Sequence, residues 1–425
     1  MMSNRRSSPP LEPQLEPPLE PQLEPPLQPF QRRRNPNCLG GLHDDLLIKI
    51  LSFLPTEVAV STCVLSKRWE FLWMWLPNLD FIYTCVPRPG LRDFIDRKLP
   101  IHRAPVIERL RLIVTRHSHI KPEDIKRWIE IAVSRHVREL DICYHSRTEN
   151  IIPSSLFTCK SLLTLKLKWI ALIYVPSMVF PSLKTLELKD LIFVDGLQQF
   201  LSICPVLEEL SVDFYEYDKT KEFSIIVQSL QSLSLFIPDD LFLDGYEIDT
   251  PSLKFLKLVN LNHWEHYSLI KNMPKLKEAY VRVGYSNLKI LNSAIESVIS
   301  VKRLTICSED VYGDGFVFKH LEHLNLCVCK KNSSNLLGKF LKDSPKLRVL
   351  DISVVKDHRF NKRYRMVSWN QPSPVPECLL SSLQIFKWSR YLGSPEEGDI
   401  AVYILKNARQ LKKATISSKP YCFYL

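Results

Sequence analysis

The most constraining feature of this 425-residue chain is a short apolar pattern that returns many times. It consists of an apolar residue, two other residues, a second apolar residue, one other residue and a third apolar residue, as in Leu162, Leu165 and Leu167. Between Leu162 and Val301 the pattern recurs in steps of 21 to 25 residues. A unit this short cannot close a core of its own, so successive units have to stack on one another.

This spacing is the mark of leucine-rich repeats. The last two apolar positions alternate with polar ones, so one face of a short strand points inward. The first such triplet begins at Ile107, and the last is Leu411, Ala414 and Ile416. Helices on the outer side are expected over 195–204, 334–342 and 398–408. The predicted fold class is α/β: a curved parallel sheet inside, with helices and loops outside.

The residue between the last two apolar positions of each triplet should point onto the inner face of the curved sheet. These positions are Asp141, Lys166, Glu187, Ser211, Ser234, Lys257, Tyr280, Thr305, Asn325, Asp351, Lys387 and Thr415. Tyr280 is the best anchor among them, because aromatic side chains are frequent at the centres of protein interfaces. We predict that Lys257, Tyr280, Thr305 and Asn325 contact a target protein.

A second informative block lies near the N-terminus, from Leu42 to Trp73. It is expected to form three short helices, capped by the side-chain oxygens of Asp44, Thr56 and Ser66. The first helix is apolar almost all round, so it needs partners on more than one side. A unit this small cannot bury all of that surface alone, so part of it should be an interface.

This block resembles the F-box, through Leu54-Pro55-Thr56 and Val64-Leu65-Ser66-Lys67-Arg68-Trp69 with Leu72-Trp73. It departs from the family where Leu42 is followed by His43, since proline usually stands there. The resemblance implies docking onto the Skp-type adaptor of a cullin–RING ubiquitin ligase. The adaptor contacts it implies are Leu42, Leu46, Leu47, Ile50, Leu51, Leu54, Pro55, Val64, Leu65, Trp69 and Trp73.

Near the C-terminus the repeat step lengthens. The run from Trp369 to Leu379, the pair Glu396-Glu397 and the segment 401–408 are similar to the FBD region of plant F-box proteins. The predicted organisation is a disordered Pro-rich tail over 1–37, an F-box over 38–85, a leucine-rich-repeat solenoid over 86–366 and an FBD-like region over 367–425. Whether the last repeat is fully capped stays open.

Composition narrows the remaining function classes. The net charge is +11, and the residues after Cys85 carry +12 spread over more than three hundred positions without a dense run, which argues against nucleic-acid binding. No apolar run approaches the length of about 20 residues that a membrane-spanning helix needs. Eleven scattered cysteines without a CxxC pair favour a reducing compartment, the nucleus or the cytoplasm. Cys327 and Cys329 stand too close together for a zinc-finger spacing.

No phosphate loop, nucleophile elbow or metal-ligand constellation is present, so we predict no catalytic residue, metal or cofactor. By resemblance, the chain is expected to be the non-catalytic substrate-recognition subunit of a Skp–cullin–F-box ubiquitin ligase, with an unknown protein target. Two other interpretations stay open: a leucine-rich-repeat scaffold or sensor without a ubiquitin role, and a basic solenoid that binds nucleic acid.

Overall fold

The computed structural model describes residues 41–83, 90–114, 120–146, 151–170, 178–191, 196–215, 222–284, 287–354 and 369–418. The tail predicted for 1–37 lies outside the described residues. The chain divides into two compact units, Met1–Leu47 and Ile48–Leu425. In the first unit the described residues are 41–47, which hold the beginning of helix α1 (Asp44–Leu51).

The helices of the second unit are short. After α1 they are α2 (Thr56–Ser61), the 3-10 helices η2 (Thr62–Leu65) and η3 (Trp69–Trp75), α3 (Leu91–Lys98), α4 (Pro122–Ser134), α5 (Ser154–Phe157), α6 (Leu197–Ser202), α7 (Leu288–Val298), α8 (Ser333–Asp343), α9 (Glu377–Ser381) and α10 (Pro395–Asn407). No helix among the described residues is long and apolar enough to span a membrane.

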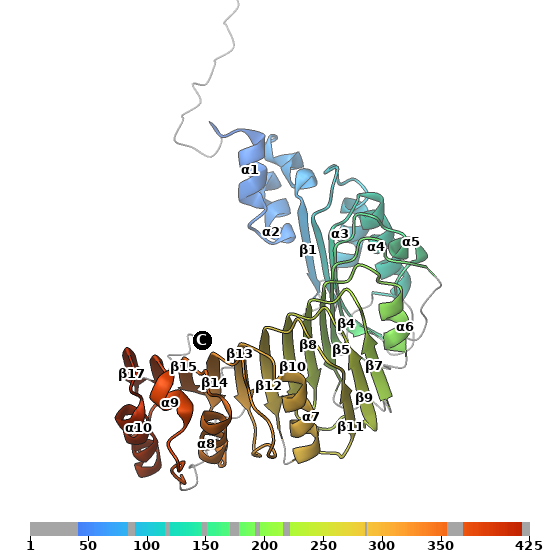
Figure 1. Ribbon diagram of the computed structural model, residues 1–425. Helices are drawn as coiled ribbons and strands as arrows, with labels where there is room; N and C mark the ends of the chain where they lie inside the picture. Colours follow the sequence, from blue (N-terminus) through green and yellow to red (C-terminus); the bar gives the residue numbers. More distant parts are fainter. Residues whose placement is uncertain are drawn as a thin grey trace, which may run out of the picture. The chain divides into compact units, whose positions relative to one another are not determined.

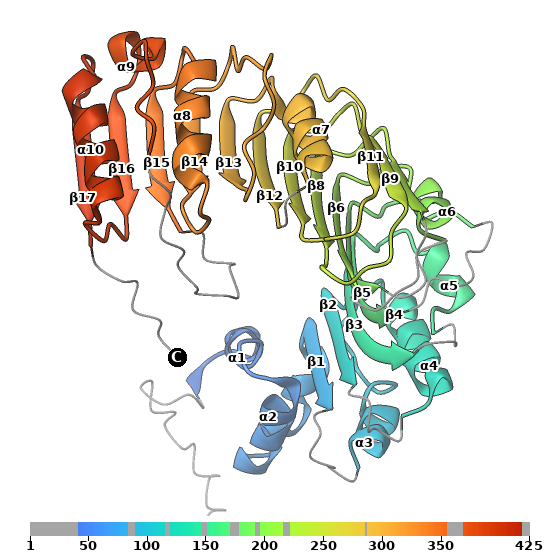
Figure 2. The same cartoon turned by 90° about the horizontal axis from the view of Figure 1, so that it is seen from below.

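Fourteen strands form one sheet in the order β1-β2-β3-β4-β5-β6-β8-β10-β12-β13-β14-β15-β16-β17. They are β1 (Asn78–Tyr83), β2 (Arg109–Val114), β3 (Glu139–Ser146), β4 (Thr164–Ile170), β5 (Thr185–Leu191), β6 (Glu209–Phe214), β8 (Ser232–Ile237), β10 (Phe255–Asn260), β12 (Glu278–Val283), β13 (Arg303–Cys307), β14 (His323–Cys327), β15 (Val349–Ser353), β16 (Ile385–Ser389) and β17 (Lys413–Ser417). Figures 1 and 2 show this sheet with helices such as α4, α6, α7, α8 and α10 on its outer side. The predicted fold class, a small helical segment followed by a curved parallel sheet with outer helices, is confirmed.

The apolar triplets supply the core between the sheet and the outer layer. From Ile107, Leu110 and Leu112 to Leu383, Phe386 and Trp388, every residue of the first twelve triplets is buried. The last two residues of the thirteenth triplet lie in strand β17, but Ile416 is 40% exposed and Ala414 is also exposed. Strand β17 is the last strand in the sheet order, and within the described residues no further repeat stacks on it.

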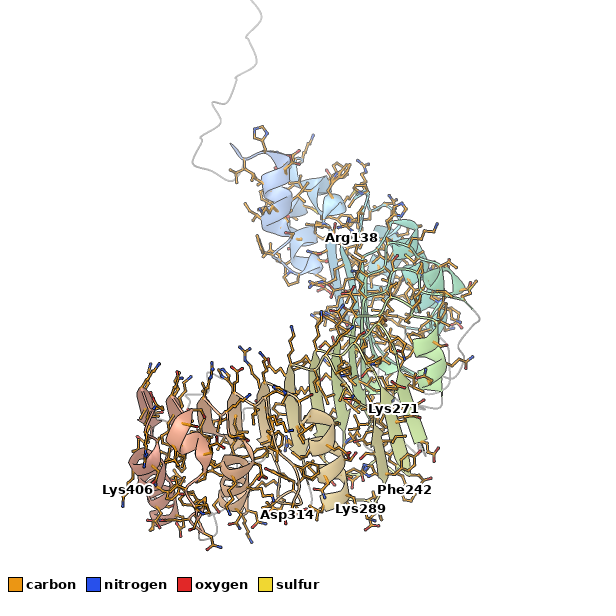
Figure 3. The ribbon with its side chains drawn as sticks, in the orientation of Figure 1. Arg138, Phe242, Lys271, Lys289, Asp314 and Lys406 are labelled. Carbon is orange, nitrogen blue, oxygen red and sulfur yellow. The ribbon has the colours of Figure 1, made fainter. Side chains whose placement is uncertain are left out.

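A second, smaller sheet was not predicted. It has three parallel strands in the order β11-β9-β7, namely β7 (Glu222–Ile226), β9 (Gly245–Asp249) and β11 (Tyr267–Ile270). The rings of Phe223 and Tyr246 stack in it at a centroid distance of 5.3 Å. Lys271, labelled in Figure 3, forms ion pairs with Glu247 and Asp249, both at 2.9 Å. Strands therefore replace helices on the outer side of the central repeats.

The three expected outer helices are present as α6, α8 and α10. Helix α10 begins with a capping box, in which Ser394 Oγ accepts from the Glu397 backbone N–H and the Glu397 carboxylate accepts from the backbone N–H of Ser394. Helices α3, α4 and α7 were not among the predictions. Helix α4 is fixed by its buried ring, since Trp128 Nε1 donates to Asp96 Oδ1 at 2.8 Å.

Candidate interaction surfaces

The helical segment from Ile48 to Leu76 has its own apolar interior. Leu51, Trp69 and Trp73 are buried, with exposed fractions of 1%, 7% and 2%. Lys98 lies over the Trp73 ring at 5.5 Å from its centroid. The predicted contact of these three residues with an adaptor stays a prediction; in this structure their side chains fill the interior of the segment.

Backbone and side-chain hydrogen bonds tie this segment to the start of the large sheet. The predicted role of Thr56 as a helix cap is wrong, since Pro55 occupies the cap position and Thr56 Oγ1 instead accepts from the backbone N–H of Asp80 in β1 at 2.8 Å. The buried His102 Nε2 donates to the carbonyl oxygen of Leu76 at 3.0 Å, because a carbonyl can only accept. The chain then passes from η3 into β1 through two residues, Leu76 and Pro77.

Several predicted contact residues of this segment are exposed. Ile50 and Leu54 are each 38% exposed, Leu65 is 63% exposed and Val64 is 88% exposed. Pro55 is exposed as well. Sequence reasoning missed Phe53, Val58, Phe71 and Trp75, which are 80%, 46%, 46% and 44% exposed. So many large apolar side chains in so short a segment are typical of a surface that a partner covers.

The first unit contributes the remaining predicted residues. Within 41–47, Leu42 is half-buried, Leu46 is 49% exposed and Leu47 is buried. The predicted adaptor contacts of Leu42, Leu46 and Leu47 stay predictions.

The predicted inner-face residues lie in one row across the sheet. Register pairs Lys257 with Tyr280, Tyr280 with Thr305, and Thr305 with Asn325 on successive strands. The same row runs from Asp80 in β1 to Thr415 in β17. The four residues predicted to contact a target are thus brought together on the neighbouring strands β10, β12, β13 and β14.

The first strands of this row, β1 to β5, differ in charge from the central strands, β6 to β14. On the first strands the charges alternate in sign and compensate one another, as in the ion pair between Arg111 and Asp141 at 3.1 Å and that between Lys166 and Glu139 at 2.7 Å. Burial raises the pKa of Asp141, although Arg111 and Lys166 act in the opposite direction. The charged side chains on these first strands therefore neutralise one another.

On the central strands β6 to β14 the row carries small or neutral residues and one cationic residue, Lys257. After two serines in the row, Lys257 Nζ lies over the Tyr280 ring at 5.5 Å from its centroid. Two strands beyond Tyr280 in the same row, Asn325 Oδ1 accepts from Ser353 Oγ at 2.9 Å. Tyr280 is half-buried rather than a projecting anchor, and the ammonium group of Lys257 lies over its ring.

Two other features escaped sequence reasoning. The rings of Phe242 and Trp264, which are 58% and 46% exposed, pack with their centroids 5.6 Å apart on two neighbouring loops; Figure 3 labels Phe242.

The second feature is a cysteine cluster, in which the sulfurs of Cys307, Cys327 and Cys329 lie within 4.8 Å of one another. Only the strand register places Cys307 beside the Cys-x-Cys pair, so the sequence spacing could not have indicated the cluster.

Three protein families match separate segments of the chain. The F-box domain matches residues 39–81. The repeats of a family described as FBD-associated F-box protein At5g56370, LRR repeats, match residues 125–307. The FBD family matches residues 371–416.

Three relatives that this chain matches over most of their length come from Arabidopsis thaliana. The FBD-associated F-box protein At5g38590 is 63% identical over 89% of this chain and 93% of the relative. The FBD-associated F-box protein At4g10400 is 53% identical over 91% of this chain and 93% of its own length. A third relative, named Putative F-box/FBD/LRR-repeat protein At5g62970, is 42% identical over 88% of this chain and 91% of its own length.

Proposed function

Because the chain belongs to the family of FBD-associated F-box proteins, we propose that it is the substrate-recognition subunit of a Skp–cullin–F-box ubiquitin ligase. The observation that carries the proposal is the exposed apolar surface of the helical segment, above all Val64 and Leu65. In this proposal the segment binds a Skp-type adaptor, and through it a cullin–RING ligase.

The adaptor contact rests on the division between buried and exposed side chains. Trp69 and Trp73 keep the helices in place, while Ile50, Leu54 and Val64 remain available to a partner. Covering an apolar side chain of this size contributes about 1.5–3 kcal/mol when it becomes fully buried. A handful of such contacts is enough for a stable complex.

The target side of the proposal is the central inner face of the sheet. Lys257 and Tyr280 combine a cation with an aromatic face, and Thr305 and Asn325 add hydrogen-bonding groups on the next two strands. Such a surface suits a protein segment that carries a carboxylate beside an apolar group. The charge-compensated strands β2 to β5 are less suited to it, because their ionic groups already neutralise one another.

We propose that the chain itself catalyses no step. Its contribution is a high effective concentration of the bound target beside the ubiquitin-carrying enzyme. The contacts of Thr56 and His102 and the direct passage into β1 support this role, since they leave little freedom between the adaptor-binding segment and the start of the target-binding sheet.

We also propose that the protein acts in the nucleus or the cytoplasm, which a fluorescent fusion in plant cells would test.

The decisive experiment is co-purification of the full-length chain with a Skp-type adaptor, followed by size-exclusion chromatography. The expected result is a stoichiometric complex. A well-folded chain that fails to bind any Skp-type adaptor would refute the ligase proposal and favour the scaffold or sensor interpretation. Affinity purification from cells with the proteasome blocked would then identify the target.

A further inference from the structure

Three cysteine thiols form a compact group at the carboxyl ends of two neighbouring strands. Cys307 is the last residue of β13, Cys327 is the last residue of β14, and Cys329 follows two residues later. Their exposed fractions are 1%, 0% and 9%, and Val354 packs against them. The Sγ atoms of Cys307 and Cys329 lie 3.4 Å apart, and the three sulfurs all lie within 4.8 Å of one another.

The loop that carries Cys329 is fixed from both sides. Lys330 Nζ donates to the carbonyl oxygen of Gly284 at 3.1 Å and lies 3.3 Å from a carboxylate oxygen of Glu309. Ser333 Oγ donates to the carbonyl oxygen of Cys327 at 3.2 Å. These contacts hold the three sulfurs close together without a disulfide between them, which is the preorganisation that a metal site needs.

We propose that Cys307, Cys327 and Cys329 form a binding site for a single Cu(I) ion. Soft thiolate sulfurs select soft ions such as Cu(I) and Zn(II). Within the described residues the group offers three sulfurs and no nitrogen or carboxylate oxygen, whereas structural zinc takes four protein ligands. A three-sulfur set therefore fits Cu(I) better, and binding replaces the thiol protons, which leave to solvent, with no change in the oxidation state of copper.

A regulatory disulfide fits the site less well. The three thiols are almost completely buried, so oxidants in solution reach them poorly and oxidation to a disulfide should be slow.

The test is an anaerobic titration of the reduced full-length chain with Cu(I), in competition with the chelator bathocuproine disulfonate. We expect one equivalent of copper per chain and X-ray absorption that shows three sulfur neighbours. Cys327→Ala and Cys329→Ala should each weaken binding by about tenfold or more, the scale at which weaker supporting contacts of metal sites already act. Cys204→Ala removes a buried thiol elsewhere and should leave binding unchanged.

Circular dichroism of each variant separates lost binding from lost folding, and Cys329→Ala is the mildest change because its residue lies in a loop. The proposal is overturned if the folded wild-type chain holds no copper against the chelator, or if the folded Cys329→Ala variant binds as tightly as wild type. Preferential retention of zinc, or a Cys307–Cys329 disulfide in chain trapped with a thiol reagent at lysis, would also overturn it.

Discussion

Replacing Val64 and Leu65 together by alanine should weaken adaptor binding without harming the fold. Both side chains belong to η2 and are 88% and 63% exposed, so the unbound chain gains little from them. Val→Ala removes two carbon groups and Leu→Ala removes three, at about 0.8 kcal/mol for each one buried. Weighted by the exposed fractions, a partner that covers both residues loses about 3 kcal/mol, which is about a hundredfold in affinity.

Isothermal titration of the full-length chain with a Skp-type adaptor measures this loss. The matched control is Val402→Ala with Leu405→Ala on α10, where the same side-chain types are 64% and 44% exposed. The control should bind as wild type does, and both variants should keep the wild-type melting temperature. If the affinity of the Val64 and Leu65 variant stays within about threefold of wild type, these residues lie outside the adaptor contact and the burial argument fails.

Three further outcomes are expected. Burial lowers the pKa of His102 from 6.5 to about 4, so the unfolded chain binds more protons than the folded chain between these pH values. The free energy of unfolding should therefore fall by about 3 kcal/mol as the pH drops from about 6.5 to about 4. Urea unfolding of the His102→Gln variant should lack this pH-dependent contribution. Thr56→Ala strands the backbone N–H of Asp80 and should cost about 1–3 kcal/mol in urea unfolding, while Thr56→Ser should recover most of it. Lys257→Glu with Tyr280→Ala should reduce target capture in affinity purification, with adaptor binding and melting temperature unchanged; undiminished capture would remove the central inner face as the recognition site.

The repeat architecture could be predicted because its signal is local and redundant. Each triplet predicts which residues of its strand face inward, and twelve repetitions of the same pattern favour a single strand register. The exposed Ile416 marks the limit of this reasoning. A triplet predicts a strand, but its burial depends on a neighbour that the triplet itself does not encode.

Where the sequence failed, the missing information was three-dimensional. Leu51 and Leu54 have similar side chains in the same helical segment, yet one is 1% and the other 38% exposed. An almost wholly apolar helix has no polar face to show which side is covered. Strands β7 and β9 are only five residues long, and nothing local distinguishes them from loop segments between triplets.

The two-residue passage from η3 into β1 has a geometric consequence for ubiquitin transfer. Adjacent strands of a sheet lie about 4.8 Å apart, and β10 stands seven positions after β1 in the sheet order, so Lys257 lies about 34 Å along the sheet from its first strand. If the chain acts as the proposed substrate receptor, the number of repeats sets how far along the sheet a captured protein is held from the first strand. In that role, inserting or deleting one repeat would move the target by one strand spacing, and would change which of its lysines are modified even if every contact with the target were kept.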